Sequence, residues 1–395
     1  MTHSIKGYKF RLYPNKEQQV LFSKTFGSCR KVYNYYLAKS IKDYAEGKKY
    51  CSVYDNQKDL TQLKKLDEFS YLREVDSQAL NYALADLGRA YEGLFAHRTS
   101  RPKFKKKSIH RDSYTTAVIS SNHFLIQGNR INIPKVGWVK LKQHRPVEGR
   151  VTQGTITRTP SGKYFVSLIC RDCDNQKLQK TGSNIGIDLG LSEFAVLSNG
   201  ARIDNPRWLS KCQQRLKRQQ RKLSKKKVGS SNYEKQRSKI AKLNEKVANQ
   251  RKDFLHKTST ELIKNHDFIS IEDLNVKSML RNNTAEEREQ QSKNYKVKLT
   301  RKREKNRHRN ISDVGWATFA SMLEYKATWY RKTVVRVDQY FPSSQLCNCC
   351  GYKNVLIKDL TVRKWICPQC RSEHDRDRNA AINILNEGMR IAHCI

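Results

Sequence analysis

The sequence contains no apolar run that approaches the roughly 20 residues a membrane-spanning helix needs. Its first ten residues, MTHSIKGYKF, include no apolar signal region. We therefore expect a soluble cytoplasmic protein, in which cysteine thiols stay reduced. A secreted protein held together by disulfides is the alternative, and the size of the chain and the missing signal disfavour it.

Signatures of several enzyme classes are also missing. The sequence has no internal repeat, no Walker-type phosphate loop and no nucleophile elbow or catalytic triad pattern. Acidic residues are scarce. The chain has 37 Asp and Glu but 78 Lys and Arg, which gives a formal charge of +41. Such an excess favours a polyanionic partner, with nucleic acid as the first candidate and a membrane surface as the second. A chain of 395 residues suggests two or three domains.

The cysteines near the end of the chain form a metal-binding pattern. Two Cys-x-x-Cys pairs, Cys347/Cys350 and Cys367/Cys370, have the spacing of a tetrahedral four-sulfur zinc site. Cys349 adds a thiol inside the first pair, but Cys347 and Cys350 keep the two-residue gap, so we exclude Cys349 as a ligand. Four thiolates leave no open coordination position, so the zinc is expected to be structural.

The first half of the chain combines helices with an all-β region. Residues 5–13 alternate as a half-buried strand, and the apolar spacing over residues 19–37, 60–66 and 77–95 predicts helices. Residues 113–172 show short alternating strands separated by hairpin turns, typical of a barrel that can also include the N-terminal strand.

A third Cys-x-x-Cys pair lies at the end of that all-β region. It is formed by Cys170 and Cys173, and no second pair lies near it. We therefore do not interpret it as a metal site.

The second half has an α/β pattern. An apolar strand ends near Asp188 and is followed by a hairpin at Asn199-Gly200; a further short strand ends at Glu272. Between them, residues 206–265 predict a long basic helical hairpin that suits a nucleic-acid surface. Residues 281–310 are charged and aperiodic, and we interpret them as a mobile loop or lid.

Three carboxylates suggest a catalytic metal centre. Asp188 and Glu272 end apolar strands, and Asp377 begins an amphipathic helix. Each has an ordinary alternative: a hairpin polar residue, a surface residue at a strand end, or a helix cap. Together they could hold two Mg²⁺ ions, which prefer oxygen ligands and support phosphodiester hydrolysis.

Contacts with nucleic acid are harder to assign. Gln78 and Asn81 lie on the polar face of a helix and could contact adenine, although such residues are more often only solvated. The segment RPKFKKK, residues 101–107, is a candidate for phosphate binding, with a solvated charge run as the alternative. The basic residues we select are Arg30, Lys103, Lys105 and Lys106.

The combined motifs resemble those of the TnpB family. They are IGIDLG at residues 185–190, IEDL at 271–274, and HDRDRNAAINIL at 374–385, preceded by the cysteine pairs CNCC and CPQC. The stretches YKFRLYPNKEQ, SDVGWATFASMLEYKA and YFPSSQLC are similar as well, so the resemblance covers nearly the whole chain. TnpB proteins are the OrfB-type proteins of insertion sequences and are relatives of type V CRISPR effectors.

The resemblance implies RNA-guided DNA cleavage by a RuvC, RNase H-like nuclease. Its metal-binding acids fall on Asp188, Glu272 and Asp377, and the family pattern selects Asp377 over Asp375 because the acid lies two residues before Asn-Ala-Ala. The cofactors implied are Mg²⁺ at the acids, one structural zinc and a guide RNA derived from the transposon end.

The resemblance also implies a domain organisation. A wedge β-barrel, residues 1–14 and 113–183, carries an inserted helical recognition domain, residues 15–112. The nuclease comprises residues 184–345 and 371–395, and it encloses a zinc ribbon at 346–370 that binds the target nucleic acid.

The family reads a short transposon-adjacent motif beside the guide-matched target. We expect Gln78, Asn81, Ser120 and Ser121 to read that motif. The partners implied are the guide RNA and double-stranded target DNA, bound by a monomeric protein in the nucleoid of a prokaryote. A repressor with an inactive nuclease, a transposase or its accessory protein, and a sequence-nonspecific nuclease are the alternative functions.

Overall fold

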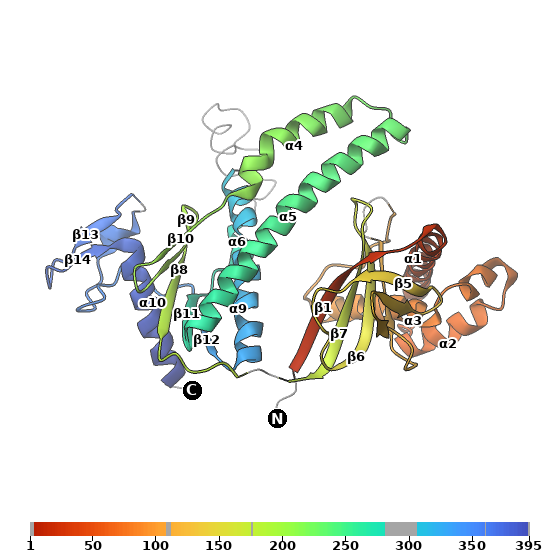
Figure 1. Ribbon diagram of the computed structural model, residues 1–395, viewed down its shortest axis with the longest axis horizontal. Helices are drawn as coiled ribbons and strands as arrows, with labels where there is room; N and C mark the ends of the chain where they lie inside the picture. Colours follow the sequence, from red (N-terminus) through yellow and green to blue (C-terminus); the bar gives the residue numbers. More distant parts are fainter. Residues whose placement is uncertain (1–3, 108–111, 175–176, 281–305, 360, 394–395) are drawn as a thin grey trace. The chain divides into compact units, whose positions relative to one another are not determined.

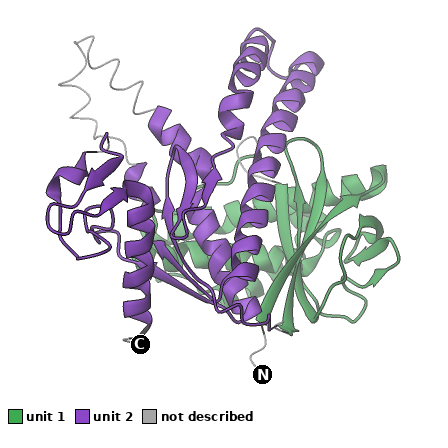
Figure 2. Ribbon diagram, turned by 60° about the vertical axis from the view of Figure 1, so that its left-hand side comes forward, with its two compact units in different colours: residues 1–174 green, residues 175–395 purple. Residues whose placement is uncertain are grey.

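The computed structural model describes residues 4–107, 112–174, 177–280, 306–359 and 361–393 (Figure 1). The chain divides into two compact units, Met1–Asp174 and Asn175–Ile395 (Figure 2). Each unit has its own core, and each is described separately below. No helix among the described residues is long and apolar enough to cross a membrane.

The described part of the first unit contains a seven-stranded antiparallel sheet. The strands are β1 (Ser4–Tyr13), β2 (Asp112–Ala117), β3 (Ile126–Gln127), β4 (Arg130–Ile133), β5 (Gly137–Lys142), β6 (Arg150–Arg158) and β7 (Tyr164–Cys173). They are arranged in the order β2-β6-β7-β1-β5-β4-β3, so the N-terminal strand pairs with the all-β region, as predicted. Strands β2 and β3 form the two edges, so the described sheet is a half-barrel rather than a closed barrel.

Helices pack against this sheet. They are α1 (Lys16–Ala45), α2 (Val53–Leu63), the 3-10 helix η1 (Asp67–Arg73) and α3 (Ser77–Phe95). Asn15 and Gln18 form a capping box that starts α1 directly after β1. Aromatic side chains join α1 to the sheet, because Phe22 and Phe26 pack against Tyr114 of β2. The helix expected at residues 60–66 already ends at Leu63. A short turn follows, and the 3-10 helix η1 begins at Asp67.

The second unit is built on a five-stranded mixed sheet in its described part. Its strands are β8 (Asn184–Leu189), β9 (Glu193–Leu197), β10 (Arg202–Asp204), β11 (Phe268–Glu272) and β12 (Thr333–Val337). The order is β10-β9-β8-β11-β12, with β8, β11 and β12 parallel and the β8-β9-β10 pairs antiparallel. Parallel neighbours place the carboxyl ends of β8 and β11 at the same edge of the sheet.

Different helices cover the two faces of this sheet. The helices of the unit include α4 (Trp208–Ser224), α5 (Ser231–Asn265), α6 (Val276–Met279), α9 (Trp316–Tyr330) and α10 (Arg376–His393), of which α5 and α9 pack on one face and α10 on the other. Ile187 of β8 shares a core with Leu255 of α5 and Phe319 of α9. The neighbouring residue Gly186 faces α10, because successive strand residues point to opposite faces.

The long basic hairpin predicted for residues 206–265 is formed by α4 and α5. The predicted lid at 281–310 is only partly described. Residues 281–305 lie outside the described part, whereas residues 306–314 are helical rather than a loop. Ile311 and Val314, spaced three residues apart, are buried in the core of the second unit and stabilise this helix.

The four-cysteine segment predicted to be a zinc ribbon, here called the ribbon, lies between β12 and α10. It contains the 3-10 helix η2 (Val355–Lys358) and the short hairpin β13 (Lys364–Ile366) and β14 (Glu373–Asp375). Its small core consists of Cys347, Ile357, Trp365 and Cys367. Strand β14 leads directly into α10, so the ribbon and the last helix are continuous in the chain.

Candidate active site

Strand register places two of the predicted carboxylates at one edge of the sheet. Ile271 of β11 is the Cα partner of Ile187 of β8, and the offset between the two strands is constant over all four pairs. The next residues along these parallel strands are Glu272 and Asp188. Glu272 is the last residue of β11 and Asp188 the last but one of β8, so the two acids lie at the same level near the strand ends, on the face that α10 covers.

A close helix–sheet contact brings the third carboxylate to this edge. A Cβ added at Gly186 would collide with the Ala381 carbonyl oxygen and lie 2.8 Å from the Leu385 backbone nitrogen. Only glycine lets α10 pack this closely on β8. One turn before Ala381, the first turn of α10 contains Asp377. The helix thus begins at the end of the sheet where Asp188 and Glu272 lie.

The carboxylates influence one another electrostatically. Burial raises the pKa of Asp188 to about 7, and the negative charges of Asp377 and Glu272 contribute to this increase. Burial also raises the pKa of Glu272. Arg376 and Arg363 oppose the shift at Asp188. Neighbouring acids disfavour the charged state unless a cation compensates, and carboxylate oxygens are ligands that Mg²⁺ prefers. Among the described residues, however, the groups whose ligand atoms already lie within 4.8 Å of one another do not include these three carboxylates.

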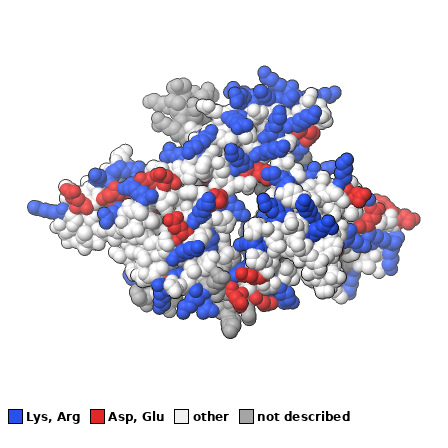
Figure 3. Space-filling model, in the orientation of Figure 1, with Lys and Arg blue, Asp and Glu red and all other residues white. Residues whose placement is uncertain are grey.

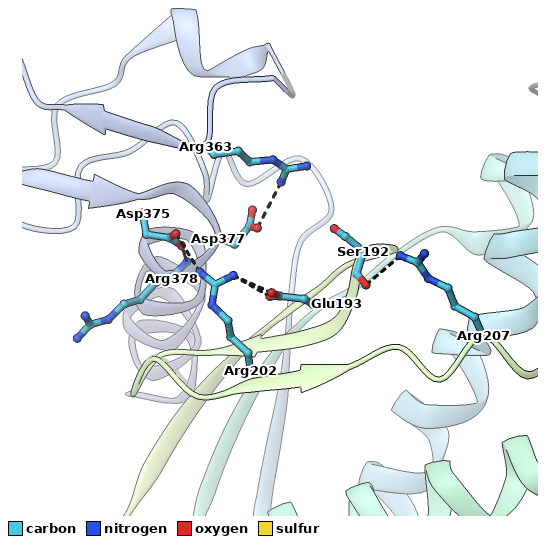
Figure 4. A network of polar contacts seen from close by, with 8 residues as sticks. All are labelled: Ser192, Glu193, Arg202, Arg207, Arg363, Asp375, Asp377 and Arg378. Atoms are coloured by element: carbon cyan, nitrogen blue, oxygen red, sulfur yellow. Dashed lines mark hydrogen bonds and ion pairs between the residues drawn. The ribbon is translucent and has the colours of Figure 1, made fainter.

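The two aspartates of the HDRD sequence occupy different environments (Figure 4). Asp375 accepts a 3.0 Å hydrogen bond from the Arg378 backbone N–H at the start of α10. Its carboxylate also pairs with Arg202 at 2.9 Å, and Arg202 in turn contacts Glu193. The carboxylate of Asp377 contacts Arg363 at 3.3 Å. Asp375 therefore caps the helix, whereas Asp377 lies close enough to Asp188 to shift its pKa.

Sequence reasoning missed the arginines of this region. Arg363 belongs to the ribbon, and its side chain is 58% exposed beside Asp377. Arg376 is buried and donates a 2.9 Å hydrogen bond to the Asp359 carbonyl oxygen. The positions of both arginines depend on contacts between the ribbon and the start of α10. The sequence signal was the alternation of Arg and Asp in HDRDR, which contains Arg376.

The four predicted zinc ligands lie together. The sulfur atoms of Cys347, Cys350, Cys367 and Cys370 lie within 4.8 Å of one another. Cys347 and Cys370 are 3.5 Å apart, and Cys350 and Cys367 are 3.6 Å apart. With zinc–sulfur bonds of about 2.3 Å, such spacings suit a tetrahedral zinc site.

Two further potential donors approach the zinc cluster. The Nε2 atom of His374 lies 3.0 Å from the Cys347 sulfur, and its ring packs on Trp365. Cys349 forms a group with Cys347 and His374 that has metal-binding spacing of its own. His374 was not foreseen, and its place beside Cys347 results from the pairing of β13 with β14.

The residues selected for nucleic-acid contact lie in different surroundings. Arg30 pairs with Asp112 at 2.7 Å, and both side chains are mostly buried. The ammonium of Lys105 lies 3.9 Å from the Tyr33 ring centre, and Asn34 holds its backbone. The exposed residues of this set are Lys103, Lys106, Ser120 and Ser121; Gln78 and Asn81 are half-buried on α3. Arg30 and Lys105 thus have contacts within the first unit itself.

The third cysteine pair is buried in the sheet. Strand β7 continues to Cys173 instead of ending at Cys170, and the Cys173 thiol donates to the Glu148 carbonyl oxygen at 3.3 Å. Among the described residues, the groups with metal-binding spacing do not include this pair.

Basic side chains gather on one part of the second unit. Figure 3 shows a concentration of Lys and Arg over the α4–α5 hairpin. Arg215, Lys217, Arg218, Arg221 and Lys222 of α4 are all exposed, whereas Leu216 is buried against α5. The hairpin therefore combines an apolar seam with a basic outer surface, as predicted from the sequence.

Comparison with known proteins identifies matching families. The family model "OrfB_IS605, Probable transposase" matches residues 163–283, and the model "Cas12f1-like, TNB domain" matches residues 316–384. The helix-turn-helix domain of the same OrfB family matches residues 1–49.

Curated relatives match over nearly the whole chain. A protein of Streptomyces pristinaespiralis named "Putative RNA-guided DNA endonuclease" is 35% identical, over 100% of this chain and 92% of its own length. "Putative RNA-guided DNA endonuclease InsQ" of Escherichia coli (strain K12) is 31% identical, over 99% and 94%. "TnpB-like protein L770" of Acanthamoeba polyphaga mimivirus is 24% identical, over 98% and 74%.

Solved structures share the fold. A Cas12f1 complex with its single-guide RNA and target DNA superposes with a TM-score of 0.58 at 13% identity, over 97% of this chain and 99% of that one. The mini RNA-guided endonuclease CRISPR-Cas_phi3 gives a TM-score of 0.51 at 9% identity, over 97% and 92%.

Proposed function

This chain belongs to the OrfB-type TnpB family of insertion-sequence proteins, and from that premise we propose that it is an RNA-guided DNA endonuclease of a transposon. The observation that carries the proposal is the convergence of Asp188, Glu272 and Asp377 from β8, β11 and α10. Parallel strands flanked by helices on both faces, with acids at the strand ends, support a RuvC-like nuclease.

In this proposal Asp188, Glu272 and Asp377 hold Mg²⁺. The bound metal supplies Lewis-acid assistance to phosphodiester hydrolysis, as in two-metal nucleases. The chain itself contributes the arrangement: β8 and β11 fix two acids by their register, and the start of α10 supplies the third. Arg363 lies beside these acids, where its exposed guanidinium can contact a phosphate.

The remaining parts of the chain receive roles from the same proposal. The helices of the first unit form the recognition domain (15–112), and its half-barrel forms the wedge domain (1–14 and 113–183) up to Asp174, where the first unit ends. Residues 184–345 and 371–395 form the nuclease, and the four-cysteine zinc ribbon binds target nucleic acid. A guide RNA supplies most of the sequence specificity by pairing, so the protein contacts backbone and needs the charge of +41.

Motif recognition is assigned to polar residues of the first unit. Gln78 and Asn81 on α3, with the exposed Ser120 and Ser121, remain the proposed readers of a transposon-adjacent motif. Lys103 and Lys106 contact phosphates. Replacing Gln78 and Asn81 by Ala should relax the motif preference in a plasmid-library cleavage assay, and an unchanged preference would remove them from this role.

The decisive experiment purifies the protein with its bound RNA. The RNA is sequenced, and the same preparation is tested for Mg²⁺-dependent cleavage of matching double-stranded DNA, with Asp188→Ala as the control. One discrete RNA, with cleavage that disappears in the variant, is the expected result. Discrete RNA without cleavage would indicate an RNA-guided repressor, and absence of a specific RNA would indicate an unguided metal nuclease.

A further inference from the structure

Two asparagines of α10 have contacts that the carboxylate chemistry does not explain. Asn379 and Asn383 are only 2% and 6% exposed. They are four residues apart, so they lie on the same side of the helix. Buried amides require hydrogen-bond partners, and both find them outside α10, in the backbone of the ribbon and the segment leading into it.

Those partners surround the first zinc cysteine. The Asn379 amide donates to the Leu346 carbonyl oxygen at 2.6 Å, and its own carbonyl oxygen accepts from the Asn348 backbone N–H at 3.0 Å. The Asn383 amide donates to the same Leu346 carbonyl at 2.7 Å and to the Ser343 carbonyl at 2.8 Å. Leu346 and Asn348 are the two neighbours of Cys347 in the chain.

The third carboxylate, Asp377, is therefore kept in position by different contacts from those of Asp188 and Glu272. Asp188 and Glu272 are fixed by strand register inside the sheet. Asp377 lies at the start of α10, where Arg376 binds the ribbon through its backbone N–H to the Arg363 carbonyl oxygen at 2.9 Å. Asn379 follows Asp377 by two residues and attaches the same helical turn to the first cysteine pair.

We propose that Asn379 and Asn383 are positioning residues that couple the zinc ribbon to Asp377, so that loss of zinc weakens divalent-metal binding at the three carboxylates. This inference rests on the proposed function, because it takes Asp377 as a metal ligand. Without zinc the backbone around Cys347 loses its fixed form, and the first turn of α10 loses its anchor. Groups that orient metal ligands typically change metal affinity by about 10- to 100-fold when they are removed.

The test measures Mn²⁺ affinity of the full-length protein by titration, with and without zinc. Zinc is removed with a chelator that is then separated, and zinc content is measured in every sample. Mn²⁺ prefers oxygen ligands, so it does not replace zinc at the thiolates.

The Asp188→Ala variant measures how much Mn²⁺ binds outside the acid site. The variants are Asn379→Ala/Asn383→Ala and the matched control Asn386→Ala, an asparagine on the same helix that is not among its buried residues.

Removing zinc from the wild type should raise the Mn²⁺ dissociation constant about tenfold or more. The double variant should show the weaker affinity while zinc is still bound, and zinc removal should then add little, because the coupling is already broken. Asn386→Ala should behave as the wild type.

An unchanged Mn²⁺ affinity of the zinc-free wild type would overturn the inference without need of any variant. The inference would also be overturned if zinc removal raised the Mn²⁺ dissociation constant of the double variant by the same factor as that of the wild type. Equal Mn²⁺ binding by the wild type and Asp188→Ala would instead overturn the proposed metal centre, and with it this inference.

Discussion

At the scale of single residues, the two aspartates of the HDRD sequence provide a direct test of the site. Asp377→Asn should reduce DNA cleavage at least about 100-fold, since even groups around metal ligands cost 10- to 100-fold. Asp375→Asn should retain most of the activity, because Asp375 caps α10 and pairs with Arg202. Rates are measured on matched DNA with saturating Mg²⁺. Equal losses in both variants would mean that Asp375 also belongs to the centre.

A buried lysine offers a second residue-scale prediction. Lys326 of α9 is 5% exposed and donates to the His256 carbonyl oxygen and the hydroxyls of Ser259 and Thr260 on α5, at 2.7–2.8 Å. Burial lowers the pKa of Lys326 to about 8. Its cationic form is therefore disfavoured in the folded protein relative to the unfolded chain.

The consequence is a dependence of stability on pH that Lys326→Met should remove. Between pH 8 and 10.5 the unfolded chain binds the extra proton, so the stability contributed at this site rises with pH. From pH 8 to 10, the stability of the wild type relative to Lys326→Met should increase by about 2 kcal/mol. Thermal unfolding of both proteins over this range measures the difference. A difference that does not vary with pH would contradict the lowered pKa.

At the scale of elements, the contact of α10 with β8 depends on a glycine. Gly186→Ala would push a methyl group into the Ala381 carbonyl oxygen. Overpacking of this kind costs about 1–3 kcal/mol, so the unfolding temperature of the second unit should fall by several degrees. Gly7→Ala on β1 is the control, because nothing lies within 4 Å of the added Cβ there. Cleavage should also decrease in Gly186→Ala, since α10 carries Asp377. An unaltered unfolding temperature would contradict this prediction, because it would show that α10 can move away from β8 at no cost in stability.

The sequence predicts these elements unequally well. Strands β8 and β11 were predictable because isoleucines alternate before Asp188 and Glu272, a pattern that requires no tertiary information. The helix at residues 306–314 was not, since only Ile311 and Val314 are buried in it and the segment before them is aperiodic. Its stability comes from tertiary contacts, including an ion pair between Asp313 and Arg251 of α5.

Side-chain roles were less predictable than elements, for a physical reason. Spacing could select Cys347 and Cys350 but could not place His374 beside them, because that contact arises only when β13 pairs with β14. Arg30 was selected as a nucleic-acid contact, and spacing could not show that it also pairs with Asp112, which lies 82 residues further along the chain. Asn379 and Asn383 did carry a signal, an i, i+4 pair of amides on the same side of the helix.

At the scale of the whole molecule, the net charge of +41 favours a polyanionic partner, and the α4–α5 hairpin presents part of that charge. Leu216 and Val247 bury the seam of the hairpin, and a hydrogen bond from Gln236 to the Gln219 side chain at 2.8 Å links its helices. The basic side chains are thereby left outside this seam. Since released counterions drive such binding, RNA affinity should fall steeply with salt concentration.

Replacing Arg221 and Lys222 of α4 by Gln should test this contribution. Removal of one phosphate-binding cation makes the slope of log affinity against log salt shallower by about 0.7–0.9, so the double replacement should change it by about 1.4–1.8. The control replaces Lys42 and Lys48 by Gln, which removes the same charge. Their ammonium groups already pair with Glu46, at 3.8 and 2.6 Å, so the slope should change less. Filter binding of the guide RNA across a salt series measures both slopes, and equal changes in the two proteins would mean that overall charge, rather than the hairpin, controls the affinity.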